Sequence, residues 1–104
     1  MILTTTDAIA GREIRETVGL VRGSAVRSTH IGSDVIAKIK EFVGGEIVEY
    51  TKLMAEVREQ ALDRMVMDAR MRGADAVVGI RYASSEISGG AAEILVYGTA
   101  VKIG

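Results

Sequence analysis

The sequence predicts an α+β fold in which one long helix packs on a small antiparallel sheet, giving two layers. Two observations lead to this prediction. Residues 46–72 contain no glycine or proline and are rich in good helix formers, whereas the chain on both sides of them is rich in β-branched residues. A chain of 104 residues and 11.1 kDa is long enough for one domain and too short for two. We therefore expect a single domain spanning residues 1–104.

The helices are predicted from composition and capping signals. The helix over 46–72 is followed by Gly73, the residue type best suited to end a helix in a left-handed conformation. A second, shorter helix is predicted over 35–42, because apolar residues recur there at helical spacing after Ser33 and Asp34.

The strands are predicted from runs of β-branched residues. A long strand over 13–27 contains Gly19 and Gly23, which are typical of bulges or close backbone contacts. Two further strands, over 76–82 and 93–103, are joined by a hairpin connection over 84–90 and pair antiparallel. Residues 2–6 favour a short extra strand at an edge, and the simplest sheet places the final strand in the middle.

Apolar residues lie on more surfaces than one subunit can bury. Alternation along the last strand points Ile94, Val96 and Ala100 to one face, and Leu95, Tyr97, Val101 and Ile103 to the other. One helical layer covers only one face of a small sheet, so the second face needs another chain or a ligand. This pattern predicts a homo-oligomer. The alternative is that the second face carries tolerated surface hydrophobic residues.

Composition excludes several functional classes. The formal net charge is −1, which gives no electrostatic reason to bind nucleic acid or an anionic membrane. The absence of cysteine excludes thiol nucleophiles, disulfides and iron–sulfur clusters, and a single histidine leaves no histidine cluster. Without an export signal or a run of 18 apolar residues, the sequence is typical of a cytoplasmic protein.

Arg58 and Asp68 are the candidate ligand-binding residues. Both lie on the apolar side of the predicted long helix, where a charge is costly unless it is paired or hydrogen-bonded. An anion-binding arginine or a pair that bridges subunits would explain them. The alternative is that the long arginine side chain extends to solvent.

His30 and Asp34 are the candidate metal ligands. They share one loop, and an imidazole and a carboxylate are both metal-ligating groups. Two ligands make half of a transition-metal shell, although a symmetric oligomer brings further copies together around its axis. The alternative is an ordinary surface histidine. No nucleophile signature surrounds any serine, so no catalytic residue is assigned and an enzyme is not expected.

The chain resembles the YbjQ family of small bacterial and archaeal proteins, described as heavy-metal-binding. The resemblance covers the whole chain and rests on short segments spread along it: Ile2-Leu3-Thr4-Thr5-Thr6, Gly11-Arg12-Glu13-Ile14, Gly19-Leu20-Val21-Arg22-Gly23, Val43-Gly44-Gly45, Glu56-Val57-Arg58-Glu59-Gln60-Ala61-Leu62-Asp63-Arg64-Met65, Gly73-Ala74-Asp75-Ala76-Val77-Val78-Gly79-Ile80-Arg81 and Tyr97-Gly98-Thr99-Ala100-Val101.

This resemblance implies a β-α-β-β subunit, similar to a dodecin subunit, that assembles into a pentameric ring. It implies no established activity and identifies no cofactor. We therefore expect a non-enzymatic cytoplasmic homo-oligomer that binds a small ligand or a metal ion. The alternative is a structural or partner-binding ring without a small ligand. Because the chain has no cysteine, thiolate coordination of a soft metal is excluded.

Overall fold

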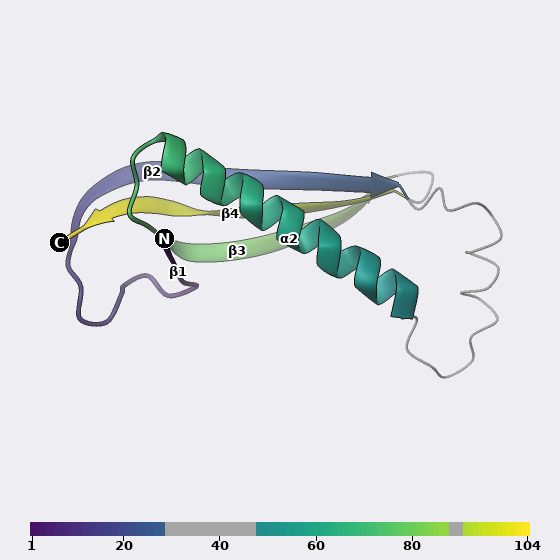
Figure 1. Cartoon of the computed structure of the whole chain (residues 1–104), viewed down its shortest axis with the longest axis horizontal. Helices are drawn as coiled ribbons and strands as arrows, with labels where there is room; N and C mark the ends of the chain where they lie inside the picture. Colours follow the sequence, from purple (N-terminus) through teal and green to yellow (C-terminus); the bar gives the residue numbers. More distant parts are fainter. Residues whose placement is uncertain (29–47, 88–90) are drawn as a thin grey trace.

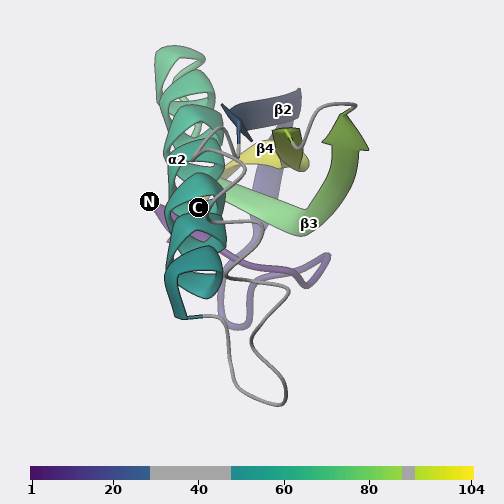
Figure 2. The same cartoon turned by 90° about the vertical axis from the view of Figure 1, so that its right-hand side faces the viewer.

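The structure, a computed structural model, describes residues 1–28, 48–87 and 91–104. It confirms the predicted α+β fold, with a four-stranded sheet packed against one helix (Figures 1 and 2). The predicted helix over 35–42 and the loop with His30 and Asp34 lie outside the described residues. In chain order the elements are β1 (Ile2–Leu3), β2 (Ile14–Ser28), α2 (Val48–Met71), β3 (Ala76–Ile87) and β4 (Ala91–Ile103).

The sheet has the order β1-β3-β4-β2, so the last strand lies in the middle, as the sequence predicts. β4 pairs antiparallel with both β2 and β3. The sheet is mixed rather than purely antiparallel, because β1 runs parallel to β3 with Ile2 opposite Ala76. The helix connects β2 to β3 and brings β3 back beside the chain's first residues in the same direction.

The strand boundaries differ from the predicted ones at the hairpin between β3 and β4. β3 continues to Ile87 rather than ending at Tyr82, and β4 begins at Ala91 rather than Glu93. Cross-strand pairing continues through this serine-rich segment, with Ser84 opposite Ile94. Residues 84 and 85 therefore belong to an exposed part of a strand and not to a turn.

The helix packs closely on the sheet at Gly23. A Cβ atom at this position would overlap backbone atoms of Ala61 and Met65, so only glycine allows the two layers to approach this closely. Gly73, with φ of 75°, follows the helix in the left-handed region, as predicted. The buried core between the layers contains Val21, Ala25, Val57, Ala61, Met65, Ala69, Val77, Ile80, Ile94, Val96 and Ala100.

The chain's own N-terminal segment covers one end of the sheet face that points away from the helix. Ala76, Val78 and Val101 are buried there beneath partly buried isoleucines, Ile9 and Ile14 among them. The alternating pattern of β4 predicted that another chain or a ligand covers this whole face. This prediction is wrong for the end of the face around Val101, because residues between β1 and β2 cross the sheet there and shield it from water.

The rest of this face is exposed. Leu20 is 59% exposed, Val26 54% and Tyr97 38%. The chain therefore leaves several large apolar side chains exposed on this part of the sheet.

Candidate ligand-binding groove

A groove lies between α2 and β3, because the helix packs on β2 and β4 while β3 curves away from it (Figure 2). The groove consists of two open hollows that share Tyr82. The larger hollow, of about 380 Å³, is lined by Leu3, Thr4, Thr5, Leu62, Ile80 and Tyr82. The smaller, of about 150 Å³, is lined by Met54, Arg58, Tyr82, Ala83, Ser84 and Ile94.

The register of the sheet explains why polar groups of β3 reach this groove. Tyr82 pairs with Val96 and Ser84 pairs with Ile94. Val96 and Ile94 are buried against the helix, and directly paired residues share a face of the sheet. Both hydroxyl side chains therefore point to the helix side, where β3 is only partly covered and Tyr82 is 49% exposed.

Arg58 stands at the mouth of the smaller hollow, one helical turn beyond Met54. Its side chain is exposed, and among the described residues no carboxylate lies within 4.0 Å of it. A guanidinium group presents a planar set of donors that matches a carboxylate or a phosphate. The smaller hollow thus combines one positive charge and two hydroxyl groups with the apolar side chains of Met54 and Ile94.

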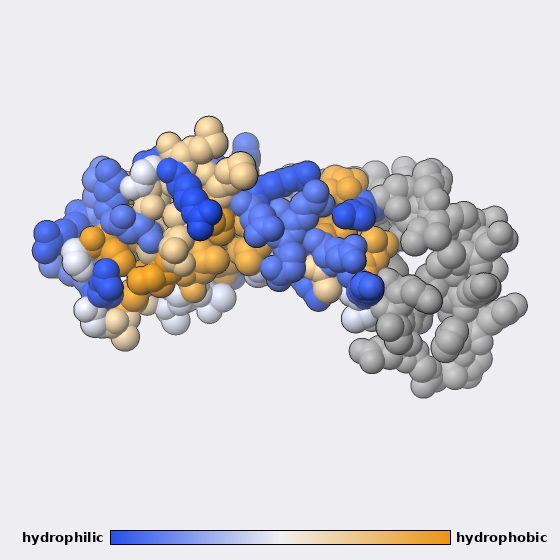
Figure 3. Space-filling model, in the orientation of Figure 1, coloured by the Kyte–Doolittle hydropathy of each residue, from blue (hydrophilic) through white to orange (hydrophobic). Residues whose placement is uncertain are grey.

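Hydrophobic surface continues beside the helix over β1 and β3, as Figure 3 shows. This region includes the larger hollow, where Leu3, Leu62 and Ile80 provide apolar side chains. An extended ligand with a negative group at one end and an apolar body would meet matching chemistry along the groove.

Asp68, the second candidate ligand-binding residue, lies elsewhere. Its carboxylate accepts a hydrogen bond from Arg72 Nε at 3.2 Å and faces the backbone N–H of Arg22 at 3.5 Å. The structure therefore places Asp68 against β2 and Arg58 beside β3, and does not bring them together. Asp68 is half-buried because it reaches the outer edge of the sheet.

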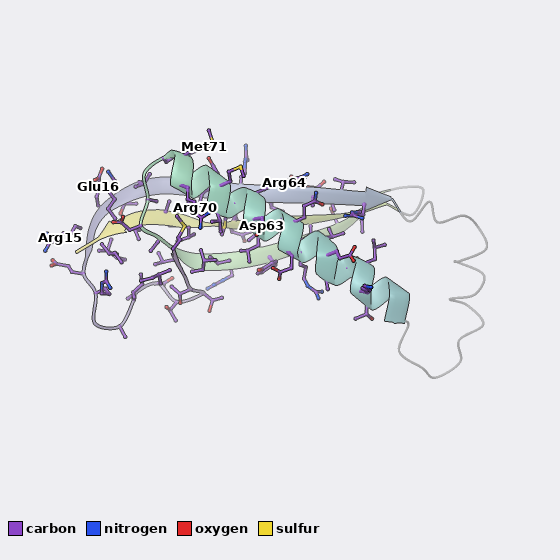
Figure 4. All side chains as sticks on the ribbon, in the orientation of Figure 1. Arg15, Glu16, Asp63, Arg64, Arg70 and Met71 are labelled. Atoms are coloured by element: carbon purple, nitrogen blue, oxygen red, sulfur yellow. The ribbon has the colours of Figure 1, made fainter. Side chains whose placement is uncertain are left out.

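Arg64, one helical turn before Asp68 on α2, bonds to the same edge of the sheet. Its Nη1 donates to the backbone oxygen of Ser24 at 2.6 Å, and Figure 4 shows Arg64 on the side of α2 that faces β2. Among the described strands, β2 pairs with β4 alone, so the outward backbone groups of Arg22 and Ser24 have no partner in another described strand. Arg64 and Asp68 satisfy one such group each. Their role at this edge is structural.

A metal centre is not assembled by the residues that the structure describes. Among them, no group of three histidine, cysteine, aspartate or glutamate residues is placed to hold an ion. The chain has no cysteine, so the thiolate ligands that soft heavy metals prefer are lacking. His30 and Asp34 lie outside the described residues and stay predictions. No helix in the described part of the chain is long and apolar enough to cross a membrane.

These features define a small α+β protein in which the described residues leave an open groove beside the helix and part of one sheet face uncovered. The chain belongs to the YbjQ family, whose model, described as "Putative heavy-metal-binding", matches residues 1–104. This finding confirms the family that the sequence resembles. The ring and the likeness to dodecin subunits stay predictions.

Relatives of the chain are similar over nearly its full length. A UPF0145 protein of Methanosarcina acetivorans is 53% identical over 103 residues, covering 99% of this chain and 97% of the relative. A UPF0145 protein of Vibrio parahaemolyticus is 54% identical over 103 residues, covering 99% and 98%. Neither name describes an enzymatic activity.

A solved structure supports the fold. It is a protein of unknown function from Pediococcus pentosaceus, assigned to the DUF74 family, with a TM-score of 0.70. Its sequence is 19% identical, and the match covers 100% of this chain and 98% of that one. At this identity the likeness speaks for the fold alone.

Sequence reasoning missed Tyr82 and Ser84 as groove residues. The signal was present, because alternation along β3 puts both on the face that carries Ile80. The predicted strand ended at Tyr82, and Ser84 fell in the predicted hairpin connection. A longer strand would have placed both hydroxyl groups beside the helix.

Proposed function

We propose that this protein is a cytoplasmic, non-enzymatic subunit of a homo-oligomeric ring that binds a small anionic ligand in the groove between α2 and β3. The ring has five subunits, as the family resemblance implies. The observation that carries the ligand proposal is the smaller hollow, where Arg58 stands beside apolar side chains and two hydroxyl groups. A carboxylate or phosphate with an attached apolar group fits this arrangement.

The size of the groove sets the size of the ligand. One water molecule occupies about 30 Å³ of liquid, so the smaller hollow, of about 150 Å³, accommodates a negative group and a few further atoms. The larger hollow, of about 380 Å³, begins at Tyr82 and offers space for an apolar body. Together they reach the range of ordinary ligand pockets, about 300–1,000 Å³.

The oligomer proposal is supported by the exposed apolar side chains on the face of the sheet that points away from α2. Leu20 is 59% exposed, Val26 54% and Tyr97 38%. A standard interface buries about 800 Å² on each partner around an apolar centre. Contact with a neighbouring copy would cover these side chains.

A metal ion is the second candidate ligand. The family description is the observation in its favour, and copies of His30 and Asp34 around a symmetry axis would supply nitrogen and oxygen ligands. A ring without any small ligand is the remaining alternative. In that case the assembled surface itself serves a partner protein.

Native mass spectrometry in a volatile buffer without chelator tests the assembly and the ligand together. We expect a species of five subunits of 11.1 kDa each, with a discrete excess mass from an organic ligand. An excess equal to metal ions would favour the second candidate, and a clean multiple would favour the ring without a ligand. A monomer would overturn the oligomer.

Arg58→Met tests the groove, because methionine keeps the apolar part of the side chain and removes the charge. The probe is 8-anilino-1-naphthalenesulfonate, an anion with an aromatic body, titrated by fluorescence. Losing a hydrogen bond to a charged group costs about 1.5–3 kcal/mol, so we expect binding to weaken by about tenfold or more. Arg15→Met, an exposed arginine of β2 outside the groove, is the matched control. Equal affinities for the two variants would remove Arg58 from the site.

A further inference from the structure

The uncovered part of the sheet carries a definite pattern of charge, and we call it the open sheet face. Its rows follow from the register: Leu20 beside Thr99, then Arg22, Tyr97 and Arg81, then Ser24, Leu95 and Ala83, then Val26, Glu93 and Ser85. Apolar groups occupy the middle and both ends. Two arginines flank Tyr97, and one carboxylate lies near the hairpin end.

The side of α2 that points away from the sheet carries the complementary pattern, and we call it the outer stripe. Its residues recur at helical spacing: Lys52, Glu56, Glu59, Asp63, Met67 and Arg70. The centre is acidic, and Figure 3 shows polar surface over this half of the helix. Met67 extends the stripe with a side chain that is 63% exposed.

Within the part of the chain that the structure describes, no ion pair involves a charge of the outer stripe. Among residues 1–28, 48–87 and 91–104, the ion pairs within 4.0 Å are Arg72 with Asp68 and Lys102 with Glu16. A shallow hollow of about 520 Å³ runs beside the stripe and exposes Lys52, Glu59 and Asp63. These groups are available to a partner.

We propose that the outer stripe of one subunit docks on the open sheet face of a second copy of this chain. The order of groups matches along both surfaces. Lys52 would lie opposite Glu93, the pair Glu59 and Asp63 opposite the two arginines, and Met67 opposite Leu20. Helical rise separates Lys52 from Glu59 and Asp63 by about 10–17 Å, and strand rise separates Glu93 from the Tyr97 row by about 13 Å.

The contact joins unlike surfaces, which lie on opposite sides of the subunit (Figure 2). Such a heterologous contact repeats from one copy to the next, and it forms a ring when the rotation between neighbouring copies closes. A symmetric contact between two open sheet faces would instead bring Arg22 and Arg81 near their own copies. Like charges across an interface are unfavourable, so the charge pattern selects the unlike pairing. This inference rests on the proposed oligomer and specifies its interface.

Two blocked variants test the direction of the contact. In the first, Glu59→Arg and Asp63→Arg reverse the centre of the outer stripe. In the second, Leu20→Glu and Arg22→Glu reverse the open sheet face. All four side chains are exposed, so both variants should fold, which circular dichroism checks. Each variant alone should be monomeric by native mass spectrometry.

An equal mixture of the two variants should associate again, in species that contain both variants. The stripe of the second variant and the sheet face of the first are unmodified, and the reversed stripe of the first variant carries charge opposite to the reversed face of the second. Glu13→Arg, an exposed charge reversal away from both surfaces, should assemble like the unmodified protein.

The outcomes separate this inference from the proposed function. If either blocked variant assembles fully, or if the mixture stays monomeric while the unmodified protein is oligomeric, the interface is wrong and the oligomer stands. If the unmodified protein is itself a monomer, the proposed oligomer fails first.

Discussion

The two faces of the sheet are closed in different ways. The face toward α2 is buried from Ala25 and Ile94 at one end to Val77 and Ala100 at the other. Among the described residues, the opposite face is covered where the N-terminal segment returns over Val101. Along β4 alone, Val101 is 1% exposed, whereas Tyr97 on the same face is 38% exposed.

This difference shows what an alternating apolar pattern does and does not predict. The pattern in β4 correctly indicates that both faces contain apolar side chains. It does not distinguish a face covered by the same chain from one left for a partner. Substitutions at the covered end of this face should therefore affect folding, whereas substitutions on its open part should affect assembly.

Val101→Asp should give the largest effect. It places a carboxylate without a partner among Ala76 and Val78, and an uncompensated buried charge costs about 3–5 kcal/mol. We expect a largely unfolded protein in urea titrations followed by circular dichroism. Leu20→Asp, on the open part of the same face, is the matched variant and should fold normally while losing assembly. A stable, folded Val101→Asp protein would contradict the closure of this end by the N-terminal segment.

Gly23→Ala should give an intermediate effect. The new methyl group meets the backbone of α2 at Ala61 and Met65, which has to move away. Overpacking of this kind costs about 1–3 kcal/mol, read as a lower urea midpoint. Ser24→Ala points to the opposite face, and Arg64 bonds its backbone oxygen rather than its hydroxyl. It should change stability by less than about 0.5 kcal/mol, and equal losses for both variants would argue against the close packing at Gly23.

Ile9→Ala should give the smallest effect on folding. Ile9 is partly buried over the covered end, and half of the burial energy of an isoleucine is about 1 kcal/mol. Val26→Ala on the open part should leave the unfolding free energy of the monomer unchanged and weaken assembly. Differential scanning calorimetry and native mass spectrometry measure the two effects. A larger loss of stability from Val26→Ala than from Ile9→Ala would show that the part around Val26, and not the part beneath Ile9, is the one closed on folding.

Local signals predicted most of the fold. The long helix follows from an uninterrupted run of helix formers before Gly73. The central position of β4 follows from the simplest connection of the strands, in which the last strand returns antiparallel between two others. The return of the N-terminal segment was not predictable, because residues 7–13 have no periodic pattern. Ile9 finds its place only once the sheet exists.

The groove depended on tertiary geometry. Arg58 was singled out because a charge stood on the apolar side of the helix, and the structure places it beside β3 rather than within the core. The open space beside it arises because β3 curves away while Gly23 holds α2 on β2. Asp68 looked equivalent in the sequence. Its position against Arg22 depends on which strand forms the outer edge.

The contacts of Arg64 and Asp68 with the outer edge of β2 have a consequence for heating. While α2 is packed on the sheet, Arg64 and Asp68 bond backbone groups on the outer edge of β2, a strand of 15 residues. No other described strand pairs with this edge. If the helix detaches before the sheet melts, that edge becomes a continuous template for other strands. The first unfolded species would then be the one most prone to cross-β aggregation, and helix release would limit the time the protein survives at high temperature.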